Sequence, residues 1–430
     1  MNLRARIARA LPNLVFFLAL LVWIAAKVSY SFGDEFPSLG LLCRWDCGWY
    51  ESIARQGYVS PIPPLFQNSE HSNVAFFPAY PFLGRAVAIA LGIPFTSALP
   101  LVSIVCALIV SLAIARHFRG LGRLSRTIRY AILVAYPATF YLFVSYSESL
   151  YLAGMLGGAA LLLDFAERES ERTESPPASA RRDSVRLALV GLAGLTLGGT
   201  RLTGFVIPSF LALGALLLAG RNFLRDRFFL RTLVFIGAAA AGIVSFFAFC
   251  QIRFGKWNLY FTQLAIGWYK EFSPRKALGI LVNHPFGPTF DYRTLQEQSR
   301  CLSWMLITTI LLVSLYAMAR AAGSLLRALR DGNRALVLRC MLVYGAFAHF
   351  FIVVCGDVGP WDIWGNGLRY PMPTVFLLAI AWRDEWTPAR LRENPALRGA
   401  ALLAIALVCA WLFALQWGYL ERFIRLEWVS

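Results

Sequence analysis

Long apolar runs alternate with short charged segments along the whole chain. A helix that crosses a bilayer needs about 20 mostly apolar residues. Eleven segments approach or reach this length, and they cover residues 11–30, 97–117, 128–146, 148–166, 186–201, 203–220, 231–252, 300–321, 338–356, 368–383 and 399–418. The pattern predicts an all-α polytopic membrane protein that forms a single domain over residues 1–430.

Basic residues indicate on which side of the membrane the connecting segments lie. Together with the N-terminal arginines, five connections hold 26 of the 41 Lys and Arg residues; they are 116–129, 164–186, 221–231, 320–339 and 383–398. Short basic loops stay in the cytoplasm. These five share one side only if the further apolar stretch 76–92 does not cross. That stretch contains Pro78, Pro81 and Arg85, so we expect it to be an interfacial helix, with the N-terminus inside and the C-terminus outside.

Two long connections fall on the opposite, outer side. Segment 31–96 is rich in Trp, Tyr, Phe and acidic residues, and segment 253–299 is basic. The connection 167–185 is polar and is expected to be a cytoplasmic linker. Because the cytoplasmic loops are mainly Arg-rich connectors, we expect the chemistry of this protein on the outer face.

Composition agrees with a membrane protein and excludes a soluble one. The chain is 58% hydrophobic, with a mean hydropathy of +0.58, and a soluble monomer would expose too much apolar surface. Its net charge of +17 could suggest nucleic-acid binding. The arginines gather in short loops between apolar runs, however, and this arrangement is a topology signal instead.

The eight cysteines are mostly isolated in apolar runs, where Cys behaves as a small hydrophobic residue. No CxxC pair and no Cys/His cluster points to zinc. Cys43 and Cys47 lie four residues apart. We expect two free thiols, with a disulfide in an oxidising compartment as the alternative.

The segment from Arg44 to Tyr58 is the most informative of the outer loop. Asp46 precedes a short amphipathic pattern that Gly57 ends. An acidic residue at this place is typical of a helix N-cap, and it could equally be a general base held at the membrane surface. Four more motifs are expected at the same outer interface: AFFPAYP at 75–81, SYSESL at 145–150, GTRLTG at 199–204 and LRYPMP at 368–373.

The order of these motifs resembles that of the PIG-V mannosyltransferases. They read RWD-x-x-WY-x-x-IA-x-x-GY, FFP-x-YP, YSESLY, TR-x-TG and RYP-x-P in this chain. The resemblance is strongest from Arg44 to Thr203. It implies the GT-C architecture, with about 11 transmembrane helices and interfacial helices in the first outer loop. It also implies inverting transfer of a sugar, typically mannose, from a polyprenyl- or dolichyl-phosphate donor to a glycolipid or glycan acceptor.

The resemblance assigns roles to residues in its motifs. Asp46 would be the general base, with Asp34 as its rival. Cations would stabilise the phosphate leaving group, and Arg201 and Arg369 are the candidates. Glu148 would hold Arg201 or orient the acceptor. The remaining substrate-binding candidates are Arg44, Trp45, Tyr50, Glu51, His71 and Tyr80.

Each role has a plainer structural alternative. Both arginines could be snorkelling side chains or could form helix-end ion pairs, and a lone surface His is usually unremarkable. Asp357 and Asp362, in a Gly- and Trp-rich turn, are further acidic residues expected near the outer face.

We expect no metal or other cofactor, because no carboxylate cluster resembles a metal site and a monophosphate donor needs less charge neutralisation. Two alternatives stay open. One is a related transferase that uses a lipid-linked arabinose or glucose. The other is a lipid or sugar transporter, for which the nearly uncharged centres of the predicted spans are unfavourable. The Arg-rich chain, which has no N-glycosylation sequon, favours a prokaryotic inner membrane over the endoplasmic reticulum.

Overall fold

The computed structural model describes residues 17–18, 20–27, 39–59, 72–171, 180–268, 270–283, 295–357 and 368–425. Within these ranges seven helical segments are long and apolar enough to cross a membrane. They correspond to all or most of α4 (Phe95–His117), α6 (Glu148–Glu171), α8 (Val206–Ala219), α9 (Arg227–Phe254), α12 (Leu295–Arg330), α13 (Arg334–Gly356) and α16 (Pro395–Ile424). The all-α fold is confirmed, and the chain is an integral membrane protein.

The other four predicted spans correspond to shorter or less apolar helices. In the sequence they overlap the helical residues 20–27, α5 (Arg123–Ala135), α7 (Ala180–Thr200) and α14 (Met372–Ala381). The prediction of one helix over 128–146 is wrong, because α5 ends at Ala135. Tyr136 precedes Pro137, and a residue before proline is disfavoured in a helix. Beyond it the chain continues as a buried irregular segment that includes η3 (Thr139–Leu142).

The two ends of the predicted linker 167–185 are helical, since α6 continues to Glu171 and α7 begins at Ala180, and residues 172–179 between them lie outside the described residues. Segment 253–299, which we predicted to lie outside, contains α10 (Leu259–Ile266) and α11 (Pro274–Asn283), and α12 already begins at Leu295. Segment 31–96, which we predicted as the first outer loop, contains η1 (Leu39–Leu42), α2 (Cys47–Gln56), η2 (Asn73–Ala75) and α3 (Ala79–Leu91).

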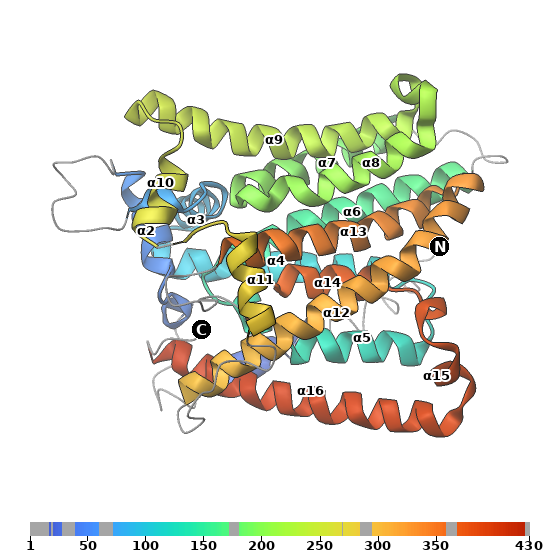
Figure 1. The fold of residues 1–430 in the computed structure, drawn as a ribbon. Coiled ribbons are helices and arrows are strands. Elements are labelled where there is room, and N and C mark those ends of the chain that lie inside the picture. Colours follow the sequence, from blue (N-terminus) through green and yellow to red (C-terminus); the bar gives the residue numbers. More distant parts are fainter. Residues whose placement is uncertain are drawn as a thin grey trace.

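The long helices run roughly side by side and give the bundle two distinct ends (Figure 1). α2, α3 and α10 gather at one end, and α3 is seen end-on there while the long helices run across the picture. α3 therefore lies across the bundle, as predicted for 76–92. The Arg-rich turns, including η5 (Gly220–Arg225) and α15 (Ala389–Glu393), lie at the opposite end.

Close packing of α7 against α9 fixes the position of the C-terminal end of α7. A Cβ added to Gly198 would lie 1.9 Å from the carbonyl oxygen of Ala239. Only glycine allows the two backbones to approach so closely, which is a frequent device between membrane helices. Arg201 follows directly after α7, so this packing also sets the position of its guanidinium group.

Ion pairs tie the helices together at the Arg-rich end. Arg116 of α4 pairs with Asp164 and Glu167 of α6. Glu169, also of α6, accepts from both Arg231 of α9 and Arg334 of α13. These partly buried ion pairs hold the helices together at the Arg-rich end of the bundle.

Candidate active site

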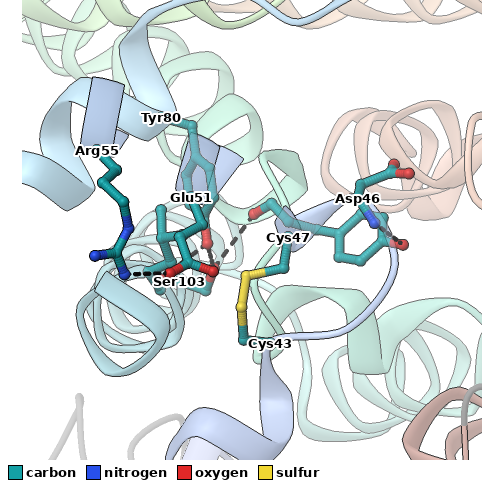
Figure 2. The surroundings of a disulfide bond; sticks show 9 residues. Cys43, Asp46, Cys47, Glu51, Arg55, Tyr80 and Ser103 are labelled. Carbon is teal, nitrogen blue, oxygen red and sulfur yellow. Dashed lines mark hydrogen bonds and ion pairs between the residues drawn. A yellow bond between two sulfur atoms is a disulfide. The ribbon is translucent and has the colours of Figure 1, made fainter. Parts of the chain in front are cut away.

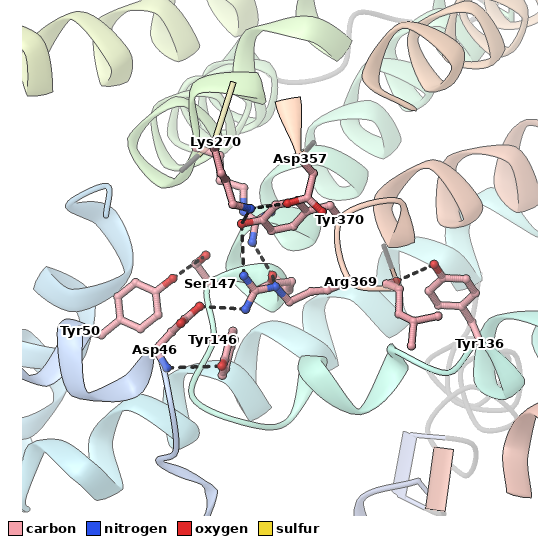
Figure 3. A network of polar contacts seen from close by, with 12 residues as sticks. Asp46, Tyr50, Tyr136, Tyr146, Ser147, Lys270, Asp357, Arg369 and Tyr370 are labelled. Atoms are coloured by element: carbon pink, nitrogen blue, oxygen red, sulfur yellow. Dashed lines mark hydrogen bonds and ion pairs between the residues drawn. The ribbon is translucent and has the colours of Figure 1, made fainter. Parts of the chain in front are cut away.

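Asp46 lies at the start of α2, at the end of the bundle away from the Arg-rich turns. Asp46 occupies the N-cap position of α2, as predicted, but its side chain makes no capping hydrogen bond to the helix. Its Oδ2 atom instead accepts a hydrogen bond from Nη1 of Arg369 at 2.8 Å (Figure 3). The side chain of Asp46 is 25% exposed, which leaves the carboxylate accessible to a substrate.

A disulfide joins Cys43 to Cys47 (Figure 2), and our expectation of two free thiols is therefore wrong. The cross-link encloses Trp45 and Asp46. Trp45 has a φ of 54° and is the one non-glycine residue with positive φ in the described ranges. This left-handed conformation costs an L-residue roughly 1–2 kcal/mol. The cross-link and the left-handed residue together determine the direction in which the Asp46 side chain leaves the turn.

Arg369 lies in the turn before α14 and reaches back to the first outer loop. Besides its bond to Asp46, its Nε atom lies 3.2 Å from Oε1 of Glu148. Its Cζ atom is 4.8 Å from the ring centroid of Tyr146. Burial acts to lower the pKa of Arg369, but the carboxylates of Asp46 and Glu148 outweigh burial and raise that pKa well above its ordinary value. The guanidinium group therefore keeps its charge under any working condition.

Glu148 is the first residue of α6, and its side chain is 1% exposed. Its Oε1 atom accepts a hydrogen bond from Nη2 of Arg201, which is the contact expected if Glu148 holds Arg201. The Cζ atom of Arg201 also lies 5.7 Å from the ring centroid of Tyr151. The buried Glu148 carboxylate thus positions two guanidinium groups, those of Arg201 and Arg369.

A third cation, Lys270, completes what we call the cation cluster (Arg201, Lys270 and Arg369). Lys270 pairs with Asp357. All three cations surround the ring of Tyr370: Lys270 Nζ lies 4.5 Å, Arg369 Cζ 5.0 Å and Arg201 Cζ 5.3 Å from its centroid. Cations are attracted to aromatic faces at such distances. The Tyr370 hydroxyl also accepts hydrogen bonds of 3.3 Å from Lys270 and from Arg369 (Figure 3).

The three carboxylates that face the cation cluster differ in exposure. Glu148 and Asp357 are 1% and 2% exposed, whereas Asp46 is 25% exposed. The two buried carboxylates therefore hold cations in place. Asp46 is the acid that an incoming hydroxyl group can reach, and it is the best placed of the three to accept a proton.

Two of the predicted substrate-binding tyrosines have hydroxyl groups that already bind the protein. Tyr50 donates to Oγ of Ser147 at 3.1 Å, and burial raises the pKa of Tyr50. The Tyr80 hydroxyl lies 2.8 Å from both the carbonyl oxygen of Leu99 and Oγ of Ser103. The two rings meet edge to face with centroids 4.9 Å apart. Both side chains fasten segment 31–96, which carries Asp46, to the rest of the bundle.

The remaining predicted residues lie at different places around this loop. Arg44 and Trp45 are half-buried inside the turn that the disulfide closes. Glu51 pairs with Arg55 at 2.7 Å, on the far side of the disulfide from Asp46 (Figure 2). Of the other candidates, His71, Asp34 and Asp362 lie outside the described residues.

The sequence interpretation missed Lys270 and Tyr370. Tyr370 adjoins Arg369 in the RYP motif, so the motif itself was an available signal. Lys270 is one of seven basic residues between 253 and 300, and no local pattern distinguishes it from the others. Within the described ranges, no group of three or more His, Cys, Asp or Glu side chains could hold a metal ion.

The chain matches no known protein-family model and no curated protein. It is similar in fold to solved structures of ArnT from Cupriavidus metallidurans in the apo state (16% identity, TM-score 0.48) and of the same protein bound to undecaprenyl phosphate (16%, 0.45). It is also similar to the oligosaccharyltransferase AglB from Archaeoglobus fulgidus in complex with an inhibitory peptide and a dolichol-phosphate (14%, 0.44).

The alignments cover 92% of this chain and 63% of ArnT, and 94% of this chain and 56% of AglB. The chain thus spans less than two thirds of the length of either protein. At these identities and TM-scores we base the functional argument on the side chains of this chain.

Removing the disulfide is expected to lower activity without unfolding the protein. With Cys43→Ser and Cys47→Ser combined, Trp45 can leave its left-handed conformation and Asp46 can turn away from Arg369. A misplacement of about 1 Å can cost up to roughly a hundredfold in rate, so we expect a ten- to hundredfold loss of the transfer activity proposed below. The measurement is turnover in detergent with and without a reductant.

The double variant should no longer respond to the reductant, and Cys409→Ser, a variant of a free cysteine in α16, should respond like the wild type. Full activity of the reduced wild type would show that the disulfide does not position Asp46.

Proposed function

We propose that this chain is a membrane glycosyltransferase of the GT-C type that transfers a sugar from a polyprenyl- or dolichyl-phosphate donor to a hydroxyl group of a glycolipid or glycan. The observation that carries this proposal is the cation cluster around Tyr370, directly beside the accessible carboxylate of Asp46. A group of cations beside a carboxylate suits the departure of a phosphate and the deprotonation of an attacking hydroxyl group.

The cation cluster would bind the donor phosphate and stabilise the charge that develops as the phosphate leaves. Arginine suits this role because its fork of N–H donors matches phosphate oxygens. Arg369 contacts Asp46 before a donor binds. A phosphate that binds Arg369 would compete with Asp46 for it, so donor binding would release the carboxylate to act as a base.

Transfer would then take place in one displacement. The acceptor oxygen forms a bond to the anomeric carbon while the bond from that carbon to the phosphate oxygen breaks. The electron pair of the broken bond leaves with the lipid phosphate, and the hydroxyl proton moves to Asp46. Attack from the face opposite the leaving group inverts the anomeric centre.

Mannose is the sugar that we propose, because the motifs resemble those of the PIG-V mannosyltransferases. Arabinose or glucose on a similar carrier is the alternative. We also propose that the site faces outward from a prokaryotic inner membrane. Two features support this sidedness: the Arg-rich turns lie at the other end of the bundle, and a disulfide, which persists in oxidising compartments, lies at the site.

The reaction is proposed to need no metal ion, since three cations are available to neutralise one departing phosphate. Chelation with EDTA should therefore leave turnover unchanged within experimental error. The comparison is made between EDTA-treated protein and the same sample resupplied with Mg²⁺ or Mn²⁺. A loss that either ion restores would contradict this part of the proposal.

The experiment that tests the function is transfer by purified protein in detergent. Radiolabelled undecaprenyl-phosphate mannose is the donor, total membrane lipids are the acceptor, and the matching arabinose and glucose donors are run in parallel. Label in a new lipid product with mannose alone supports the full proposal. Label that appears with the arabinose or glucose donor instead would show that the transferred sugar is not mannose. If no donor supports transfer, the protein is reconstituted into vesicles and the exchange of lipid between leaflets is measured. Exchange without transfer would favour a transporter instead.

A further inference from the structure

An apolar groove of about 780 Å³ runs along the membrane-spanning part of the bundle. Its floor is the face of α6 that carries Ala153, Gly157 and Ala160, and α4 and α7 form its two sides. From Leu150 to Asp164, which both line it, α6 rises by about 21 Å. The groove therefore follows much of the roughly 30 Å hydrocarbon core of a bilayer.

The groove opens to the lipid along its sides. Ile109 of α4 is 44% exposed and Leu192 of α7 is 58% exposed, and both line it. At the outer end α3 lies over it, with Leu83 in its wall. An apolar chain can therefore enter from the side, between α4 and α7, without passing through water.

The groove continues beneath α3 towards the candidate active site. A second hollow of about 490 Å³, between α3, α7 and α9, shares Leu83, Leu150 and Thr196 with the first. Two residues that line the second hollow lie close in the chain to the candidate active site. Gly199 is two residues before Arg201, and Leu150 is two residues after Glu148, the carboxylate that pairs with Arg201 and Arg369.

The apolar lining of both hollows suits a long apolar tail, and an anionic head on that tail would suit the neighbouring cation cluster. The cation cluster would hold the head. The groove has one helix as its floor, and its shape suits one extended chain. We propose that this groove binds the isoprenoid chain of the lipid-phosphate donor and that Gly157 keeps it open, so that the protein selects donors by chain length. This inference rests on the proposed function, since it assigns the tail of the same donor.

Gly157 is the position where this inference can be tested most directly. A Cβ atom added there would meet no atom within 4 Å, so a larger side chain would enter the groove rather than clash with a neighbouring helix. Gly237 of α9 provides the matched control. It also lies inside a helix and has the same open space, but it lines neither hollow.

We expect Gly157→Leu to reduce kcat/KM for undecaprenyl-phosphate mannose at least about tenfold, which corresponds to roughly 1.4 kcal/mol. With citronellyl-phosphate mannose, whose short chain ends near the headgroup, Gly157→Leu and the wild type should be equal. Gly237→Leu should match the wild type with both donors. Equal use of the long donor by Gly157→Leu and the wild type would overturn the inference. A folded Gly157→Leu that lost activity equally with both donors would also overturn it, because the effect would not depend on the isoprenoid chain.

A binding measurement separates this inference from the proposed reaction. Undecaprenyl phosphate with a photoreactive diazirine at the far end of its chain should label peptides of α4, α6 or α7 in the wild type and label them less in Gly157→Leu. Labelling of other helices would overturn the groove assignment while leaving the transfer reaction intact. Labelling in the groove by a protein that transfers no sugar would support the groove as a lipid-phosphate site and reject the proposed function.

Discussion

Replacing Asp46 with Asn is expected to reduce transfer by roughly 10²- to 10⁴-fold, the usual contribution of a general base. Asn has nearly the same shape as Asp and can still accept a hydrogen bond from Arg369 through its carbonyl oxygen, but it cannot take up the proton of the acceptor. The loss should appear in kcat, because the cation cluster that would bind the donor stays complete. Turnover and donor affinity are measured on the same purified sample.

Asp384→Asn is the matched control for this variant. Asp384 also pairs with an arginine, Arg129, at 2.8 Å, but this pair lies at the opposite end of the bundle. Asp384→Asn should keep nearly full activity. If the two variants lost activity equally, the effect of Asp46→Asn would come from a broken ion pair and not from a missing base. Undiminished kcat in Asp46→Asn would move the base to another acid, with Asp34 the first to test.

Features that depend on local composition were predictable from the sequence. Within the described residues most of the long apolar runs are helical, because a membrane leaves the backbone few alternatives. The placement of the Arg-rich turns at one end followed from counting crossings, and Pro78 and Pro81 marked 76–92 as unsuited to a regular span. Asp46 and Arg369 stood out as charged residues beside apolar runs in recognisable motifs.

Features that depend on contacts distant in sequence were not predictable. Asp46 and Arg369 are 323 residues apart, and nothing in either motif indicates the other as its partner. Lys270 enters the site through its contact with Asp357, 87 residues away. The early end of α5 was missed for another reason. The residues after Tyr136 are apolar, and hydropathy does not distinguish a helix from a buried irregular segment, although Pro137 was a local signal that the helix ends.

Arg369→Lys and Arg369→Ala are expected to affect activity and stability differently. A lysine keeps the charge, but one ammonium group cannot reach Asp46, Glu148 and Tyr370 together as the guanidinium fork does. Arg369→Lys should therefore stay folded and lose on the order of 10²- to 10³-fold in kcat, the effect of removing one transition-state donor. Arg369→Ala should lose activity and also about 3 kcal/mol of stability, because Asp46 loses its partner and the buried Glu148 keeps only Arg201.

The control for Arg369 is Arg129, whose side chain is 7% exposed and which pairs with Asp384 away from the site. Arg129→Ala should lower the midpoint of thermal unfolding in detergent, as Arg369→Ala does, while its kcat at a temperature where it stays folded remains near that of the wild type. Loss of stability with a nearly unchanged kcat is the result expected for any buried arginine that only stabilises the bundle, whichever end of the bundle it lies at. The role of Arg369 in the reaction therefore depends on the lysine variant: a folded Arg369→Lys with wild-type kcat would make Arg369 a structural residue and leave Arg201 and Lys270 to bind the phosphate.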